Sequence, residues 1–181
     1  MTARSRNRKR AGAALALAAL ALAGLGAAPA RKTPSGLPVP RYVSLKFSEV
    51  NARGGPGEDY KLLWTYRTKG LPLQVVAETY DWRRICDPEG AMAWVKRTAV
   101  DSRRTVMYPA PQPLTLRRRP DSGAGAAAVL NGHSIAGLDD CKDGWCRLSA
   151  GRAKGWAPAS SLWGVADEVQ CKPPPPPARR K

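Results

Sequence analysis

The sequence has 181 residues, with 30 lysines and arginines against 14 aspartates and glutamates, a formal net charge of +16, one histidine and four cysteines. A chain of this length forms one ordinary domain or two small ones. The single histidine argues against sites built from clustered histidines, and the excess of basic residues favours anionic partners.

The N-terminus has the pattern of a secretory signal peptide. Residues 1–10 carry five basic groups and no acid, and the apolar run AGAALALAALALAGLG that follows is too short to span a bilayer securely. Small residues at Ala28 and Ala30 suit cleavage before Arg31, so we predict a signal peptide over 1–30. The alternative is an uncleaved, membrane-anchoring helix.

Export sets the compartment and the partners that we expect. Cleavage leaves 25 basic residues against 14 acidic ones, a charge of +11, on a periplasmic or secreted protein. Such a protein would associate peripherally with anionic lipid headgroups, wall polymers or acidic proteins. Nucleic acid is not expected as a partner outside the cytosol.

The chain contains an internal repeat. The segment NARGGP (51–56) aligns with TLRRRP (115–120), WRRI (82–85) with WCRL (145–148), and Trp94 with Trp156. The intervals between the proline and the two tryptophans are 26 and 12 positions in the first copy and 25 and 11 in the second. Three ordered landmarks at nearly constant spacing indicate two copies, at 42–104 and 105–166.

Each copy has the local signals of short strands. Residues 71–78 (LPLQVVAE) are rich in β-branched residues, residues 81–85 alternate apolar with polar, and residues 93–95 follow the turn-forming DPEG (87–90). No window after residue 31 has a capped helical period. Short strands separated by turns predict an all-β fold, a small barrel or a sandwich.

The series NARGGPG, KGLPLQVVAE, DWRRI and WVKR, and in the second copy LRRRPDS, CKDGWCRL and GWAPASSLWG, resembles the bacterial SH3-like (SH3b) domain found in tandem in exported proteins. The resemblance covers about residues 41–166 and implies two SH3-like β-barrels of five to six strands. Ala93 departs from the family pattern, which has glycine there, as at Gly155. We therefore expect a signal peptide (1–30), a linker (31–41), two barrels (42–104 and 105–166) and a proline-rich basic tail (167–181).

No catalytic constellation is visible. His133 has no second ligand set at metal spacing, and no nucleophile with a base is apparent, so we expect neither an enzyme, nor a metal, nor a cofactor. Exported SH3b domains are often joined to wall-cutting cysteine peptidases, but such a domain needs more residues and a histidine partner. We expect a non-catalytic protein that binds peptidoglycan, its stem peptides or an envelope protein. The alternative is a structural or regulatory subunit acting by protein contact alone.

The four cysteines predict disulfides more readily than zinc or redox sites. Cys141 and Cys146 flank the hairpin dipeptide Asp143-Gly144, which suits a bridge across a hairpin. Cys86 with Cys171 would then leave no free thiol. Four cysteines allow three connectivities, so the pairing stays open.

The aromatic residues allow two interpretations. Trp94 and Trp156, in small-residue contexts, are expected in the barrel cores. A shallow ligand groove is predicted beside the long first loop and a hairpin, formed by Tyr60, Tyr66, Tyr80, Trp82 and Arg83. The tail KPPPPPARRK (172–181) is typical of a polyproline II segment.

Overall fold

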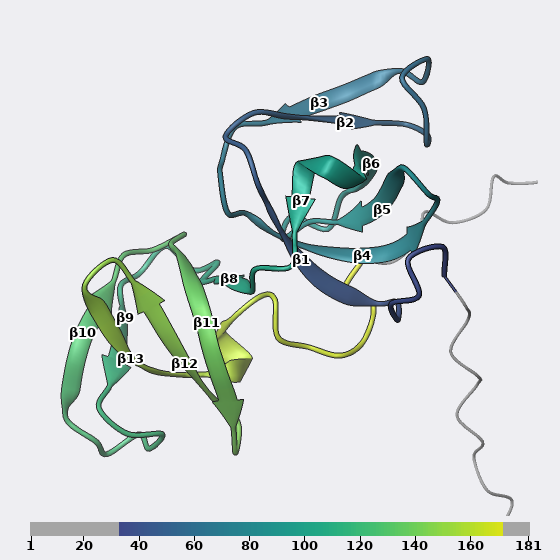
Figure 1. Ribbon diagram of the computed structural model, residues 1–181. Coiled ribbons are helices and arrows are strands. Elements are labelled where there is room, and N and C mark those ends of the chain that lie inside the picture. Colours follow the sequence, from purple (N-terminus) through teal and green to yellow (C-terminus); the bar gives the residue numbers. More distant parts are fainter. Residues whose placement is uncertain (1–32, 172–181) are drawn as a thin grey trace, which may run out of the picture.

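The computed structural model describes residues 33–171; the predicted signal peptide and the polyproline segment lie outside the described residues. Within 33–171 every regular element is a β-strand or a short 3₁₀ helix, and the strands form two antiparallel sheets. Figure 1 shows each sheet curled into its own small barrel, here called barrel 1 (33–104) and barrel 2 (105–166). In this range no helix is long and apolar enough to cross a membrane.

Barrel 1 is a seven-stranded sheet in the order β3-β2-β6-β5-β4-β1-β7. Its strands are β1 (Arg41–Leu45), β2 (Val50–Arg53), β3 (Leu62–Tyr66), β4 (Pro72–Glu78), β5 (Trp82–Cys86), β6 (Met92–Lys96) and β7 (Val100–Asp101), with the 3₁₀ helix η1 (Arg97–Ala99) before β7.

Barrel 2 repeats this topology in the order β10-β9-β13-β12-β11-β8. Its strands are β8 (Thr105–Met107), β9 (Leu114–Arg117), β10 (Ala126–Leu130), β11 (Ile135–Lys142), β12 (Trp145–Ala150) and β13 (Ala153–Pro158), followed by η2 (Ala159–Ser161). An isolated bridge between Met107 and Trp163 stands where β1 pairs with β7 in barrel 1. The repeat seen in the sequence is therefore a repeat of strands.

The cores follow from alternation along the strands. On β6, Ala93 and Val95 are buried and pack with Ile85 and Val75, and in barrel 2 Ala157 packs with Leu116 and Leu148 in the same manner. The prediction that the two repeated tryptophans fill the cores is wrong. Trp94 and Trp156 are half-buried, because their buried neighbours on β6 and β13 take the inward positions and turn the indoles outward.

The residue before the repeated tryptophan differs between the two barrels. Gly155 lies so close to β9 that an added Cβ would stand 2.7 Å from the Leu116 Cβ. A real Cβ essentially never approaches so closely, so glycine suits this position. Barrel 1 accommodates Ala93 at the matching place, where it is buried in the core.

A polar and aromatic junction joins the barrels. The Thr105 hydroxyl at the start of β8 donates to the Gly70 carbonyl (2.8 Å), and the Tyr42 and Trp163 rings meet edge to face at 5.4 Å. Arg104 lies over the Tyr42 ring and donates to the Gly164 carbonyl (3.0 Å). Burial raises the pKa of Tyr42 to about 12. These contacts set the orientation of barrel 2 relative to barrel 1.

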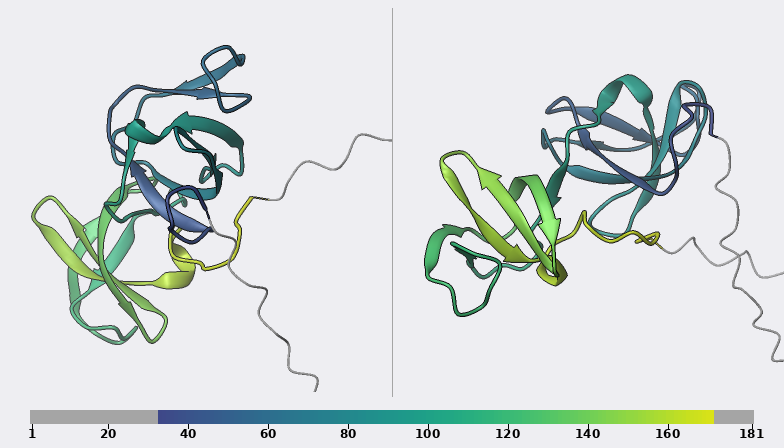
Figure 2. Two further views of the ribbon diagram at one scale, coloured as in Figure 1. Left: turned by 45° about the vertical axis from the view of Figure 1, so that its right-hand side comes forward. Right: turned by 60° about the horizontal axis from the view of Figure 1, so that its bottom comes forward.

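The chain then returns from barrel 2 to barrel 1 (Figures 1 and 2). Residues 167–171, here called the strap, were expected to begin the tail but pack on barrel 1. The fully buried Gln74 side chain donates to the Glu168 carbonyl (2.7 Å) and accepts from the Gln170 amide (2.9 Å). The strap ends at Cys171, which is bonded to Cys86 of β5 with a Cα–Cα distance of 5.6 Å.

The second disulfide lies within one hairpin. Cys141 of β11 and Cys146 of β12 are directly opposite in the register, with a Cα–Cα distance of 4.0 Å. Asp143 and Gly144 in the turn both have positive φ, of 50° and 77°, as a two-residue hairpin turn requires. All four cysteines are therefore bonded, in one of the three connectivities that the sequence allows.

Candidate functional site

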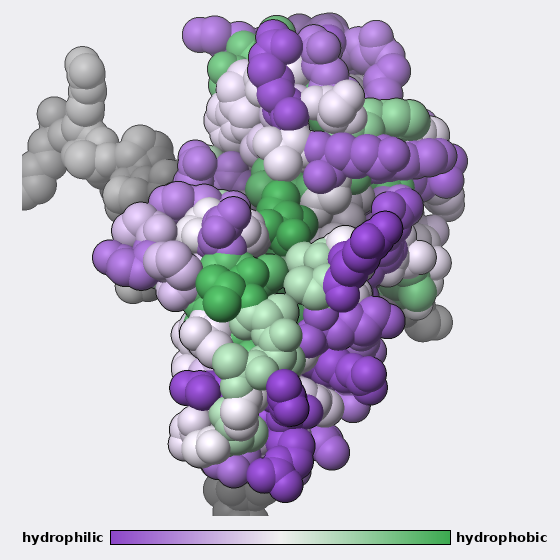
Figure 3. All heavy atoms as spheres, turned by 90° about the vertical axis from the view of Figure 1, so that its left-hand side faces the viewer, coloured by the Kyte–Doolittle hydropathy of each residue, from purple (hydrophilic) through white to green (hydrophobic). Residues whose placement is uncertain are grey.

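A cleft of about 440 Å³ lies where the two barrels meet. Barrel 1 contributes the end of β3, the segment after it and the turn after β5, and barrel 2 contributes β8 and the start of β11. Its lining is Trp64, Thr65, Tyr66, Arg67, Thr68, Leu71, Asp87, Pro88, Glu89, Ala91, Met107, His133 and Ile135. Figure 3 shows apolar side chains gathered near the middle of one face, where the barrels meet, with hydrophilic side chains around them.

Trp64 and Tyr66 form the aromatic wall of the cleft, and a carboxylate of the turn after β5 anchors Tyr66. The Tyr66 hydroxyl donates to Asp87 Oδ2 (2.9 Å), while Asp87 Oδ1 accepts from the amides of Glu89 (3.1 Å) and Ala91 (2.8 Å). Burial, and then the Asp87 carboxylate, raise the pKa of Tyr66 well above its usual range. Trp64 meets the Tyr66 ring edge to face at 5.9 Å. The Tyr66 ring is therefore held in place for contact with a ligand, and the Trp64 ring packs against it.

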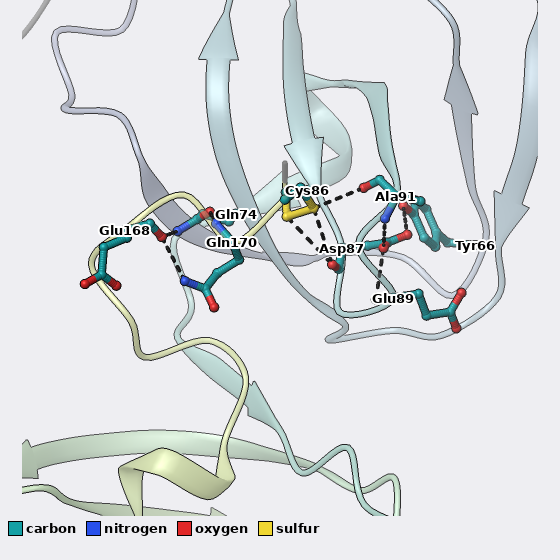
Figure 4. The surroundings of a disulfide bond; sticks show 9 residues. Tyr66, Gln74, Cys86, Asp87, Glu89, Ala91, Glu168 and Gln170 are labelled. Carbon is teal, nitrogen blue, oxygen red and sulfur yellow. Dashed lines mark hydrogen bonds between the residues drawn. A yellow bond between two sulfur atoms is a disulfide. The ribbon is translucent and has the colours of Figure 1, made fainter. Parts of the chain in front are cut away.

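The strap disulfide supports the same wall. Cys86 directly precedes Asp87, and Figure 4 shows the bond to Cys171 beside the turn that carries Asp87, Glu89 and Ala91. Covalent attachment of the strap thus restrains the turn whose carboxylate orients Tyr66.

The rim of the cleft carries charges of both signs. Arg67 has a side chain 76% exposed and only a long contact to Glu49 (3.9 Å), so its guanidinium is available to an acidic ligand group. Glu89 is exposed on the turn after β5. A ligand bearing both an amino and a carboxyl group would find a partner for each.

His133 is placed by the loop between β10 and β11. It has a positive φ of 55°, its amide donates to the Ala110 carbonyl (3.1 Å), and the preceding Gly132 lies against the Pro111 backbone, where an added Cβ would stand 2.1 Å from the carbonyl oxygen. His133 lines the cleft, and the sequence does not predict this, because no local pattern shows that its loop faces the other barrel.

The aromatic wall and the charges of the rim give the cleft groups that can contact a ligand. Within residues 33–171, no cluster of three histidine, cysteine, aspartate or glutamate side chains could hold a metal ion. The cysteines are bonded in pairs, so none offers a thiol to His133 as a base.

The structure separates the five residues of the predicted groove. Tyr66 alone lines the interbarrel cleft. Trp82, 8% exposed, lines a different cavity of about 290 Å³. Tyr60 lies across Gly55 in the long loop between β2 and β3, and Tyr80 projects from the β4–β5 turn with 80% of its surface exposed.

Arg83 has a structural role in barrel 1. It is 5% exposed, and its Nε lies 3.1 Å from Glu78, whose buried carboxylate also pairs with Arg41 and accepts from Ser35. An acidic ligand would have to compete with this buried ion pair. On β5 it is the neighbouring Arg84 that turns toward the outer face.

The tandem of small antiparallel barrels, with a cleft between them, defines the class of protein. The chain belongs to the bacterial SH3 domain family, whose model matches residues 46–102 and 110–164. No curated protein matches the chain significantly.

Among solved structures, NlpC1 and NlpC2 from Trichomonas vaginalis are similar at 10% and 11% identity, each over 68% of this chain and with a TM-score of 0.31. The chain covers 45% and 48% of their lengths, and this degree of likeness carries no argument about function.

Proposed function

We propose that this protein is a non-catalytic binding protein of the cell envelope, and that the interbarrel cleft takes a peptide segment of the cell wall. Membership of the bacterial SH3 family suggests cell-wall binding as a class. The observation that carries the proposal is the cleft itself, with its fixed aromatic wall and its charged rim.

The size and chemistry of the cleft suit a short peptide. Its volume of about 440 Å³ lies within the range of small-ligand sites, roughly 300–1,000 Å³. The Trp64 and Tyr66 rings offer an apolar contact, while Arg67 and Glu89 offer opposite charges for a carboxylate and an ammonium group. Peptidoglycan stem peptides present these groups, which makes them the ligand class that we favour.

The compartment is part of the proposal. Two disulfides fit an extracellular or envelope protein, because such bonds persist in oxidising surroundings. The signal peptide predicted at 1–30 agrees with periplasmic location or secretion.

Retention on purified sacculi tests the proposal. We expect the wild-type protein to stay bound at moderate salt. The single variants Arg67→Ala and Glu89→Ala should each reduce retention markedly, and both side chains are exposed, so their removal leaves the fold intact. Lys61→Ala is the matched charge control for Arg67→Ala, and Tyr80→Ala tests the β4–β5 turn as the alternative site; both residues are exposed outside the cleft.

Three outcomes would contradict the proposal. Equal losses for Arg67→Ala and Lys61→Ala would mean charge attraction alone, which salt screens. Loss with Tyr80→Ala but not with the cleft variants would favour a site near the β4–β5 turn. No retention of the wild type, together with stable capture of an envelope protein, would favour the regulatory subunit.

A further inference from the structure

Both barrels carry the same row of side chains on the outer face of three neighbouring strands. In each row, a tryptophan lies directly between two arginines in the strand register. The rows are Arg53–Trp94–Arg84 in barrel 1 and Arg117–Trp156–Arg147 in barrel 2. Register partners in an antiparallel sheet share a face, and the buried residues that flank them show that this face is the outer one.

The row in barrel 2 lies in a larger basic surface, here called the Trp156 face. A shallow cavity of about 330 Å³ there is lined by Arg118, Ala127, Arg147, Lys154, Gly155 and Trp156. The Lys142 ammonium lies 5.3 Å from the centre of the Trp156 ring, so one more cation is held beside the indole.

No salt bridge within the described residues pairs a base of this face. All five salt bridges found in 33–171 lie in barrel 1 or in the segment leading out of it, and none involves a base of 105–166. Asp140 stands opposite Arg147 in the register but forms no salt bridge with it. Unpaired charges of one sign attract a ligand of the opposite sign.

Part of the face is also rigid. Arg117 donates to the Ala124 carbonyl (3.1 Å) and Arg118 to the Ala126 carbonyl (3.1 Å), and these hydrogen bonds hold the β9–β10 loop against the end of β9. No hydrogen bond between residues 33 and 171 engages the side chains of Arg147 and Lys154, so their donors face solvent. The half-buried indole and the free cationic donors line the same cavity.

We propose that the Trp156 face binds an acidic saccharide, with a sugar ring against the indole and its acid group held by Arg147 and Lys154. The planar guanidinium forms paired hydrogen bonds with a carboxylate or phosphate. A lipid surface fits less well, because Val129 is the only large hydrophobic side chain prominently exposed in the described barrel 2. This site is separate from the interbarrel cleft and does not depend on the function proposed for it.

Calorimetric titration of the exported protein with a galacturonic acid tetrasaccharide tests the proposal. We expect saturable binding of this probe and none of neutral maltotetraose. Arg147→Gln should weaken binding by about tenfold, because one charge-assisted contact is lost. Arg152→Gln removes the same charge from an exposed position outside the cavity and should change affinity by less than about twofold.

Trp156→Phe should retain part of the affinity and Trp156→Ala should abolish binding, whereas Arg67→Ala in the cleft should have no effect. Equal losses for Arg147→Gln and Arg152→Gln would overturn the site, since binding would then follow net charge. No binding of the tetrasaccharide would overturn it, and so would tighter, Trp156-dependent binding to phosphatidylglycerol vesicles. Because Arg147 is exposed, its variant decides the question even where a tryptophan variant folds poorly.

Discussion

Removing the Cys86–Cys171 bond should destabilise this protein far more than removing Cys141–Cys146. The first bond joins residues separated by 85 positions and the second joins residues separated by 5. Loop-closure entropy grows with the logarithm of loop length, so the long bond should contribute about 4.6 kcal/mol to the free energy of unfolding and the short one about 2 kcal/mol. The long loop encloses all of barrel 2, so this figure applies where both barrels unfold together.

The assay is urea unfolding followed by tryptophan fluorescence, with the paired variants Cys86→Ala/Cys171→Ala and Cys141→Ala/Cys146→Ala. Alanine suits Cys86, Cys146 and Cys171 because these positions are buried. An equal or smaller loss for the long bond would refute the reasoning. Two resolved transitions in the wild type would refute its premise, because barrel 2 could then stay folded inside the loop while barrel 1 opens.

Three further results are expected from the contacts of barrel 1. Burial alone would raise the pKa of Glu78, but hydrogen bonds from Ser35 and Arg41 lower this pKa to about 2. The ionised carboxylate therefore stabilises the fold above pH 4.5, and this contribution is lost as the pH falls through 2. Glu78→Gln should cost about 3 kcal/mol at neutral pH and remove that acid step from the stability curve; an unchanged step would contradict the assignment. Gln74→Leu should cost about 2 kcal/mol and speed amide exchange in the strap, and unaltered exchange would show that the disulfide alone holds the strap. Tyr42→Phe should change the stability by less than about 1 kcal/mol, because the buried Tyr42 hydroxyl has no partner within 33–171; a larger loss in thermal or urea unfolding would reveal one.

The fold could be predicted from the sequence because its landmarks are local. Repeated prolines and tryptophans mark equivalent turns and strands, and the aligned segments WRRI and WCRL mark β5 and β12. The hairpin disulfide is local as well, since Cys141 and Cys146 flank a turn dipeptide.

The candidate site could not be predicted because it depends on which way side chains turn and on how the barrels meet. Arg83 and Arg84 are adjacent, yet one pairs with a buried carboxylate and the other faces outward. The cleft exists because Tyr42, Trp163 and Thr105 set the angle between the barrels, and these residues are far apart in the chain. The burial of the repeated tryptophans could not be predicted for the same reason. Their neighbours along the strand occupy the core positions, and the indoles turn outward.

The strap also determines how the chain would carry mechanical load. The Ser35 amide is hydrogen-bonded to Glu78 of barrel 1, and Cys171 is bonded to the same barrel by a disulfide. Both ends of the described chain are therefore attached to barrel 1. A pulling force applied between residues 33 and 171 would run through β1, β4 and β5 to the Cys86–Cys171 bond and would bypass everything between those two cysteines. Barrel 2 would therefore remain unstretched while barrel 1 is under tension. Only after the Cys86–Cys171 bond is reduced could barrel 2 be extended by the force.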